Sequence, residues 1–183
     1  MSLKIAFIGK MCSGKSTMCR YLQSIHSEFI VLSFAAKIKE IARDLFEMKK
    51  KDRALLQQIG TKMRELDSDV FAKYLIRQSN KSNFVLVDDV RYINELNYLK
   101  KNGFILVKLV ISPQFQKKRI EQLYGEHSDE HLSRLGHSSE TIQEQIDDKE
   151  FDVIIDVEND NVYKILERML KIFRNDINTH YNK

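Results

Sequence analysis

The chain has 183 residues, 43% of them hydrophobic, which suits one domain with a substantial core. Its 30 Lys and Arg residues against 26 Asp and Glu residues leave a mild positive charge that does not by itself indicate nucleic-acid binding and suits an anionic small molecule equally well. No apolar run approaches the roughly 18 residues that span a bilayer, and the two cysteines have the spacing of neither metal ligands nor a disulfide framework. We therefore expect one cytoplasmic domain over residues 1–183, without a nucleic-acid or membrane partner.

The first 25 residues predict a strand, a glycine-rich loop and a helix. Residues 3–8 form an apolar run typical of a buried strand, and the apolar residues of 16–25 recur at helical spacing. Between them, two glycines five positions apart are followed by lysine and serine, which is the P-loop pattern. Glycine lets the backbone approach an anion, and the helix that follows directs its positive end toward it. We predict that these residues bind the phosphates of ATP: Gly9, Met11, Cys12, Ser13, Gly14, Lys15, Ser16 and Thr17.

Two side chains of this loop have specific expected roles. Lys15 would reach the β- and γ-phosphates, and the Ser16 hydroxyl would be a ligand of Mg²⁺. Cys12 is expected to be an ordinary loop residue and not a nucleophile, because no positioned base is evident from the sequence. ATP and Mg²⁺ are thus the expected cofactors.

Residues 28–80 predict a short strand followed by helices. An apolar run at 28–33 predicts the second strand, and helical patterns begin at about Ala36, Asp52 and Asp69. The region 36–80 is therefore expected to be a helical insertion.

The third predicted strand, residues 84–87, runs directly into Asp88 and Asp89, as a buried parallel strand ending in carboxylates would. This pair is the best candidate for the acid on the metal side, with Asp88 or Asp89 acting on Mg²⁺ through water, and Asp88 is also expected to contact the acceptor. Arg91 follows at once, and an arginine there is suited to binding a second phosphate with two parallel hydrogen bonds. This favours a phosphoryl acceptor over water.

The second half of the chain alternates again between helices and strands. A helix around residues 93–101 is followed by a strand at 104–111, a helix from Pro113 to about Tyr124, a fifth strand at 151–157 and a last helix from 162. Residues 125–138 show little apolar periodicity and are expected to be an exposed, mobile segment. With the preceding helix they would form a lid over about 115–138, in which Arg119 and Arg134 could stabilise the transferring phosphoryl group.

Five strands alternating with helices predict a three-layer α/β/α fold of the P-loop NTPase class with a five-stranded parallel sheet. In such sheets ligands bind at the carboxyl ends of the strands, where the P-loop, Asp88 and Val157 would meet.

The chain resembles the P-loop deoxynucleoside monophosphate kinases, which are best known from bacteriophages and are related to phosphomevalonate and dephospho-coenzyme A kinases. The resemblance spans roughly residues 5–160. Besides the P-loop it rests on Ser33, Phe34 and Ala35 before a helix bearing Lys39; on Asp52, Arg53, Leu55, Leu56, Gln57, Gly60 and Arg64; on Asp89, Val90, Arg91, Asn94 and Glu95; and on His137, Ser139 and Glu140. The chain departs from the family at Ala36 and Lys37, where an acid and often a proline are expected, and at Phe71, where a tryptophan is frequent.

The resemblance implies transfer of the ATP γ-phosphoryl group to the 5′-phosphate of a nucleotide. Arg64 and Arg91 would then grip the acceptor phosphate, Lys39 and Gln57 would contact the acceptor, and adenine would lie near Arg119 and Val157.

The sequence leaves alternatives open. The chain could be a P-loop kinase of another metabolite, as dephospho-coenzyme A kinase is, or a nucleotide-binding switch without an acceptor, and it could form a homodimer. Asp88 or Asp89 could be a helix cap, and each arginine could be an ordinary surface ion-pair partner.

Overall fold

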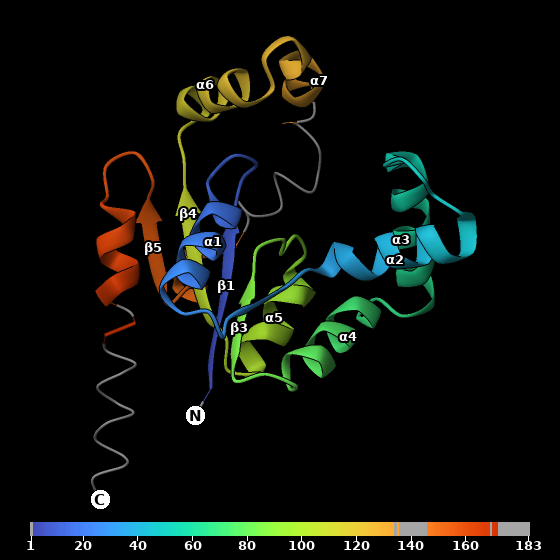
Figure 1. Cartoon of the computed structure of the whole chain (residues 1–183), viewed down its shortest axis with the longest axis horizontal. Helices are drawn as coiled ribbons and strands as arrows, with labels where there is room; N and C mark the ends of the chain where they lie inside the picture. The colour runs from blue at the N-terminus through green and yellow to red at the C-terminus, as the bar shows by residue number, and fades with distance from the viewer. Residues whose placement is uncertain (1, 134, 136–145, 169, 172–183) are drawn as a thin grey trace, which may run out of the picture.

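The computed structural model describes residues 2–133, 135, 146–168 and 170–171. They contain a five-stranded sheet whose pairings are all parallel and whose strands follow the order β2-β3-β1-β4-β5 (Figure 1). The strands are β1 (Leu3–Gly9), β2 (Ile30–Leu32), β3 (Phe84–Val87), β4 (Ile105–Val110) and β5 (Val153–Asp156). The helices are α1 (Lys15–Ile25), α2 (Phe34–Phe46), α3 (Arg53–Leu66), α4 (Val70–Ser79), α5 (Ile93–Lys101), α6 (Pro113–Tyr124) and α7 (Ser128–Leu132), with 3-10 turns η1 (Gly125–His127) and η3 (Asp148–Glu150), and residues 162–168 are also helical.

The central strand β1 is buried along its whole length. Successive side chains of a strand point to opposite faces of the sheet. Leu3, Ile5 and Phe7 therefore pack into one core cluster, whereas Ala6 and Ile8 pack into the other. A continuous apolar run is what a parallel strand covered on both faces requires.

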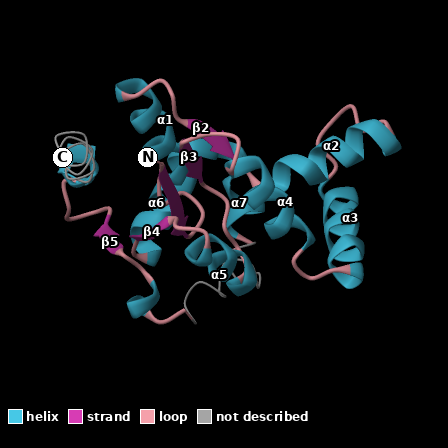
Figure 2. Cartoon of the chain, turned by 90° about the horizontal axis from the view of Figure 1, so that it is seen from below, coloured by secondary structure: helices cyan, strands magenta, loops and turns pink. Residues whose placement is uncertain are grey.

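Helices cover both faces of the sheet, and α1 and α5 lie on opposite sides of the strands (Figure 2). Met18 and Leu22 of α1 join the core cluster around Phe7, whereas Leu96 of α5 joins the cluster around Ala6. The predicted three-layer α/β/α fold is confirmed.

The predicted helical region 36–80 comprises α2, α3 and α4. In Figure 1, α2 and α3 extend to the right, beyond the sheet. Ile38 of α2, Ile59 of α3 and Phe71 of α4 pack in the same core cluster, so the helices are joined to the sheet by apolar contacts.

The segment 125–138, expected to be exposed and mobile, has regular structure in its first part. Residues 125–132 are helical, as η1 and α7, although none of them is buried. The rings of Tyr124 at the end of α6 and His131 in α7 stack with centroids 3.6 Å apart, a contact that apolar periodicity does not reveal. Of the remaining predicted lid residues, Arg134 and 136–138 lie outside the described residues.

The carboxyl ends of the parallel strands meet at one edge of the sheet. The P-loop follows β1, the acidic pair follows β3, and Val157 follows β5. Helices α6 and α7 lie above this edge in Figure 1. The expected clustering of the candidate site residues thus follows from the sheet topology.

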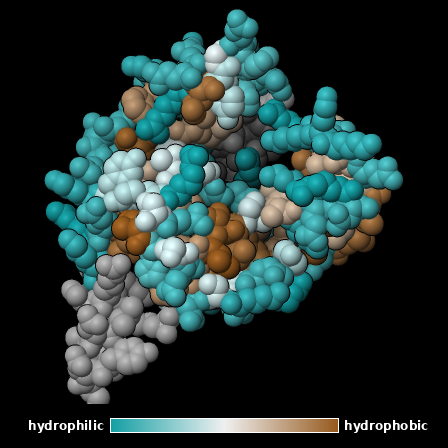
Figure 3. Space-filling model, in the orientation of Figure 1, coloured by the Kyte–Doolittle hydropathy of each residue, from teal (hydrophilic) through white to brown (hydrophobic). Residues whose placement is uncertain are grey.

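Most of the face seen in Figure 3 is hydrophilic, and its hydrophobic residues form separate patches. No helix among the described residues is long and apolar enough to span a bilayer.

Candidate functional site

The P-loop connects Gly9, the last residue of β1, to Lys15, the first residue of α1. Gly14 precedes the helix with φ of 102°, a left-handed conformation that glycine adopts without strain. Gly14 has no side chain that could cap this helix, and the positive end of the helix dipole favours an anion at its start.

Gly9 allows a close approach inside the loop. A Cβ at this position would stand 2.6 Å from Ser13 Oγ and 2.7 Å from the carbonyl oxygen of Leu109. Ser13 itself is only 1% exposed, and its Oγ makes no hydrogen bond among the described residues. Glycine is therefore required here by packing against β4 as well as by the loop.

The two functional side chains of the loop point to different partners. Lys15 Nζ donates hydrogen bonds to the carbonyl oxygens of Gly9 and Lys10, at 2.5 and 2.8 Å. Ser16 Oγ donates to Asp88 Oδ2 at 2.5 Å. A hydroxyl and a carboxylate oxygen are thus side by side at the start of α1, which is the hard oxygen ligand chemistry that Mg²⁺ prefers.

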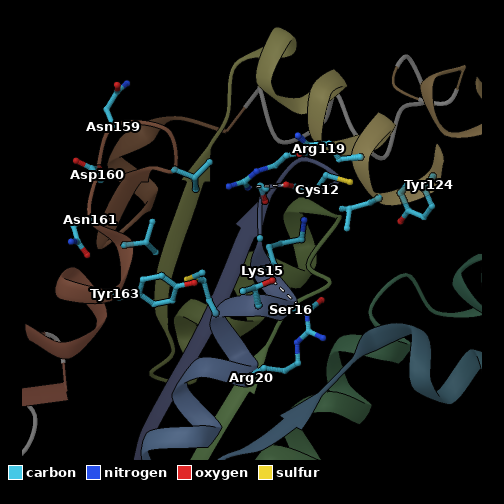
Figure 4. Close-up of a pocket in the computed structure, with 18 residues that line it drawn as sticks. Cys12, Lys15, Ser16, Arg20, Arg119, Tyr124, Asn159, Asp160, Asn161 and Tyr163 are labelled. Atoms are coloured by element: carbon cyan, nitrogen blue, oxygen red, sulfur yellow. Dashed lines mark hydrogen bonds between the residues drawn. The ribbon is translucent and has the colours of Figure 1, made fainter. Parts of the chain in front are cut away.

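A cleft of about 930 Å³, here named the P-loop cleft, lies between the loop, α6 and the segment after β5. Figure 4 shows Arg119 reaching from α6 toward the loop above Lys15, with Asn159, Asp160 and Asn161 on the far side. The cleft is lined by Cys12, Ser13, Gly14, Lys15, Ser16, Thr17, Met18, Arg20, Arg119, Gln122, Leu123, Tyr124, Val157, Asn159, Asp160, Asn161, Val162 and Tyr163. Gly9 and Met11 belong to the loop but are absent from this lining of described residues.

Helix α6 is attached to the P-loop by two side chains. Arg119 Nη1 donates to the carbonyl oxygen of Cys12 at 3.1 Å, and Gln116 Nε2 donates to that of Met11 at 2.9 Å. Gln116 is 3% exposed, and Arg119 also lies over the ring of Phe115 at 4.7 Å. These contacts hold the cation of Arg119 beside the P-loop.

A second cavity of about 160 Å³, here named the cationic pocket, lies between α2, α3 and the start of α5. Its lining contains the four acceptor residues predicted outside the acidic pair: Lys39, Gln57, Arg64 and Arg91. They come from three separate parts of the chain, so the fold brings together residues that only the family resemblance had linked. The remaining lining residues are Phe34, Ala35, Ile38, Leu56, Gly60, Asp89, Tyr92 and Glu95.

The adjacent carboxylates Asp88 and Asp89 serve different elements. Asp88 accepts from Ser16 and is not among the described residues that line the cationic pocket, whereas Asp89 lines that pocket. Asp89 accepts from Ser33 Oγ at 2.5 Å and from the amides of Phe34 and Ala35, both at 2.9 Å. It therefore satisfies the first amides of α2, which explains why α2 begins at Phe34, before the expected Ala36.

Arg64 is held from several sides. Its guanidinium lies 4.9 Å from the ring centre of Phe71 and 4.4 Å from that of Tyr92. Its Nη2 is 3.4 Å from Glu95 Oε1, and the Glu95 side chain is only 3% exposed. The ring of Phe71, where the resemblance leads us to expect a tryptophan, packs against this arginine.

Two ionisable groups near the cationic pocket have shifted pKa values. Burial raises the pKa of Glu95 from 4.5 to about 7, although the amides of Arg91 and Tyr92 and the charge of Arg64 oppose the shift. Desolvation and the charges of Arg53, Lys39 and Arg91 lower the pKa of Lys51 from its usual range. Positive charges therefore crowd this side of the edge, which favours an anionic ligand.

Sequence reasoning missed several residues of the site. Glu95 and Tyr92 line the cationic pocket, Gln116 supports the loop, and Lys51 belongs to the cation cluster near Arg91. In the sequence, Glu95 belongs to a stretch that carries the family resemblance but has no predicted role. Its burial has no local sequence signal. No cluster of metal-binding His, Cys, Asp or Glu residues occurs among the described residues.

Comparison with known proteins supports the fold and leaves the family undetermined. No protein-family model and no curated protein sequence matches the chain. Among solved structures, it is similar to shikimate kinase from Acinetobacter baumannii in complex with shikimate, at 16% identity and a TM-score of 0.55 over 96% of this chain and 95% of that one. It is also similar to APS kinase from Mycobacterium tuberculosis in complex with AMPPNP and APS, at 12% identity and a TM-score of 0.59 over 94% and 98%. The chain has the fold of these P-loop kinases.

Shikimate kinase from Aquifex aeolicus is a further match, at 18% identity and a TM-score of 0.52 over 96% of this chain and 99% of that chain. At such low identities the likeness establishes the fold alone. The choice of acceptor must be argued from the cationic pocket.

Proposed function

We propose that this chain is a nucleoside monophosphate kinase that transfers the γ-phosphoryl group of ATP to a deoxynucleoside 5′-monophosphate and yields the diphosphate. The observation that carries the proposal is the cationic pocket, in which Lys39, Arg64 and Arg91 converge. Asp89 of its lining directly follows Asp88, which accepts from Ser16 of the P-loop cleft. Such cations would bind an acceptor phosphate through charged hydrogen bonds. Residues 1–183 would act as one kinase domain, with 36–80 on the acceptor side.

The P-loop cleft would hold ATP. Its volume of about 930 Å³ suits a nucleotide, and the loop amides, Gly14 and the start of α1 favour phosphates. Lys15 would leave the carbonyl oxygens of Gly9 and Lys10 and bind the β- and γ-phosphates. Ser16 and Asp88 fit the role of Mg²⁺ ligands, Asp88 through water or directly, and the ion would supply charge neutralisation on the phosphates.

The acceptor phosphate would lie in the cationic pocket. At about 160 Å³ the pocket is smaller than the roughly 300 Å³ or more of most ligand sites, so it suits the phosphate end of a nucleotide. Arg64 and Arg91 would grip the phosphate, and Lys39 and Gln57 would contact the acceptor nearby. No general base is needed, because the attacking acceptor oxygen is already anionic, and catalysis depends on position and charge.

Arg119 would stabilise the transferring phosphoryl group from the donor side, because it lies beside the P-loop, where it donates to the carbonyl oxygen of Cys12. Val157 borders the same cleft and suits the adenine end of ATP. Arg134 remains a proposed second lid arginine outside the described residues.

The proposal is tested by coupled detection of ADP with dAMP, dCMP, dGMP and dTMP, the four ribonucleotides, dephospho-coenzyme A and no acceptor. We expect at least one deoxynucleotide to raise ADP production well above the rate with ATP alone. If only dephospho-coenzyme A raised ADP production, the chain would be a kinase of another metabolite and not of nucleoside monophosphates. Nucleotide binding without stimulation by any acceptor would leave a nucleotide-binding switch and overturn the proposal.

A further inference from the structure

The guanidinium of Arg64 is fixed in a cage of side chains from α4, α5 and the loop before α5. The rings of Phe71 and Tyr92 flank it at 4.9 and 4.4 Å, and Glu95 Oε1 lies 3.4 Å from Nη2. On its own helix, Gly60 leaves room for it, since a Cβ there would stand 3.0 Å from Nη1. Two rings fix the plane of the group, and the carboxylate fixes one edge.

Glu95 has partners besides Arg64. Its Oε2 accepts from the amides of Arg91 and Tyr92, at 2.9 and 3.1 Å, so the carboxyl group also forms the start of α5. The residue as a whole is 2% exposed, and water cannot compensate its charge. Arg64 is therefore the main positive partner of a buried carboxylate.

An acceptor phosphate on Arg64 would place a second anion against the same cation. Like charges that share a site raise the pKa of one of them. The Glu95 carboxyl is already about half protonated at pH 7, because burial raises its pKa to about 7. The weaker anion, the carboxylate, is then the one that becomes neutral.

We propose that Glu95 is a positioning residue, which holds Arg64 as its counter-ion in the empty cationic pocket and takes up a proton from solvent when an acceptor phosphate binds to that arginine. The inference rests on the proposed function, since it requires a phosphorylated acceptor. The protonated carboxyl still accepts from the amides of α5, so the helix start is preserved while the negative charge that would oppose the phosphate is removed.

Other groups near Glu95 bear on its protonation. They are Arg64 from α3, Asp89 from the loop after β3, Lys39 of α2 in the same pocket, and Arg91 and Tyr92 ahead of α5. Asp89 adds negative charge that favours the proton, whereas Arg64 opposes it. The phosphomonoester has its second pKa near 6 and is a dianion at pH 7.5, so its own titration contributes little there.

The experiment is isothermal titration calorimetry at pH 7.5, with dAMP, dCMP, dGMP and dTMP titrated in turn into the full chain. The measurement is repeated in buffers of different ionisation enthalpy, and the slope of binding enthalpy against that quantity gives the protons taken up. We expect about 0.75 proton per acceptor for the unaltered chain and near zero for Glu95→Gln, with affinity falling about fivefold between pH 7 and pH 8 only in the former.

Glu65→Gln is the matched control, because Glu65 is an exposed carboxylate one residue from Arg64. It should keep the uptake of the unaltered chain. Binding without proton uptake in the unaltered chain, or equal uptake in Glu95→Gln, would overturn the inference and leave the kinase proposal intact. If none of the monophosphates binds, it is the proposed function that fails, and the inference falls with it.

Discussion

The P-loop cleft and the cationic pocket hold their polar groups by different means. In the cleft, consecutive residues of one loop supply backbone amides, and glycines at positions 9 and 14 make the close approach possible. In the pocket, side chains from α2, α3 and the start of α5 supply the charge, and other side chains hold them in place. The P-loop itself is therefore a local structure, whereas the cationic pocket and the other walls of the cleft form only when distant elements have packed.

This difference bears on tolerance to mutation. A phosphate site made of backbone amides keeps most of its hydrogen-bond donors when one side chain is removed. The exception is a side chain, such as that of Lys15, that itself carries the positive charge. A site made of side chains loses donor, charge and support separately. The variants below probe each component.

Lys15→Ala should have the largest effect, because it removes the charge that would reach the transferring phosphates. We expect turnover to fall by roughly 10²- to 10³-fold or more. Because the loop amides remain in this variant, ATP should still bind, as measured by calorimetry, although activity is lost. Lys49→Ala, on the exposed residue after α2, is the control and should keep full activity. Substantial turnover by Lys15→Ala would show that the backbone alone suffices.

The unfolding free energy of the protein should depend on pH through the titration of Glu95. Its folded-state pKa of about 7 lies above the unfolded value of 4.5, so its stabilising contribution is complete below pH 4.5 and is lost as pH rises through 7. The loss amounts to about 3 kcal/mol of unfolding free energy, at 1.36 kcal/mol per pKa unit. Glu95→Gln should lack this component, so that the difference between the variants in urea unfolding grows more favourable to Gln from pH 5 to pH 8. If the difference in unfolding free energy did not change with pH, the pKa of Glu95 would not be raised in the folded protein.

Arg91→Ala should weaken use of the acceptor by about 1.5–3 kcal/mol in kcat/KM, the scale of a hydrogen bond to a charged group. The KM for ATP should stay unchanged, because Arg91 lines the cationic pocket and is not among the described residues of the P-loop cleft. Steady-state kinetics with each substrate varied in turn makes the distinction. If only the KM for ATP changed, Arg91 would belong to the ATP site and not to the acceptor site.

The same contrast explains what the sequence revealed. The P-loop, the five strands and the helix from Pro113 to Tyr124 are encoded by contiguous patterns, and the structure has them at the predicted places. The cationic pocket depends on contacts between residues far apart in sequence, such as Arg64 with Glu95. Of its arginines, Arg91 is suggested by its place after the third predicted strand, whereas only the family resemblance suggests Arg64. The sequence could not separate Asp88 from Asp89, because that choice depends on which hydroxyl or amide each carboxylate faces.

The smallest expected effect concerns Gly60 of the cationic pocket. It tests whether this pocket needs a residue without a side chain, as the P-loop does at Gly9. In Gly60→Ala, the new Cβ would stand 3.0 Å from Arg64 Nη1 and 3.3 Å from Ile38 Cδ1, both at the ends of side chains that can move slightly. Alanine also favours the helix by about 0.5–1 kcal/mol, so the unfolding free energy should hardly fall.

Arg64 cannot shift as freely as its length suggests, because two rings and a carboxylate confine it. We therefore expect the acceptor KM to rise about two- to fivefold, equivalent to the ~0.5–1 kcal/mol of a displaced rotamer, with the KM for ATP unchanged. Thr61→Ala, at the exposed neighbouring position on α3, is the control and should alter neither KM. An unchanged acceptor KM in Gly60→Ala would mean that the cage around Arg64 tolerates displacement, and that only the P-loop half of the site requires its glycines.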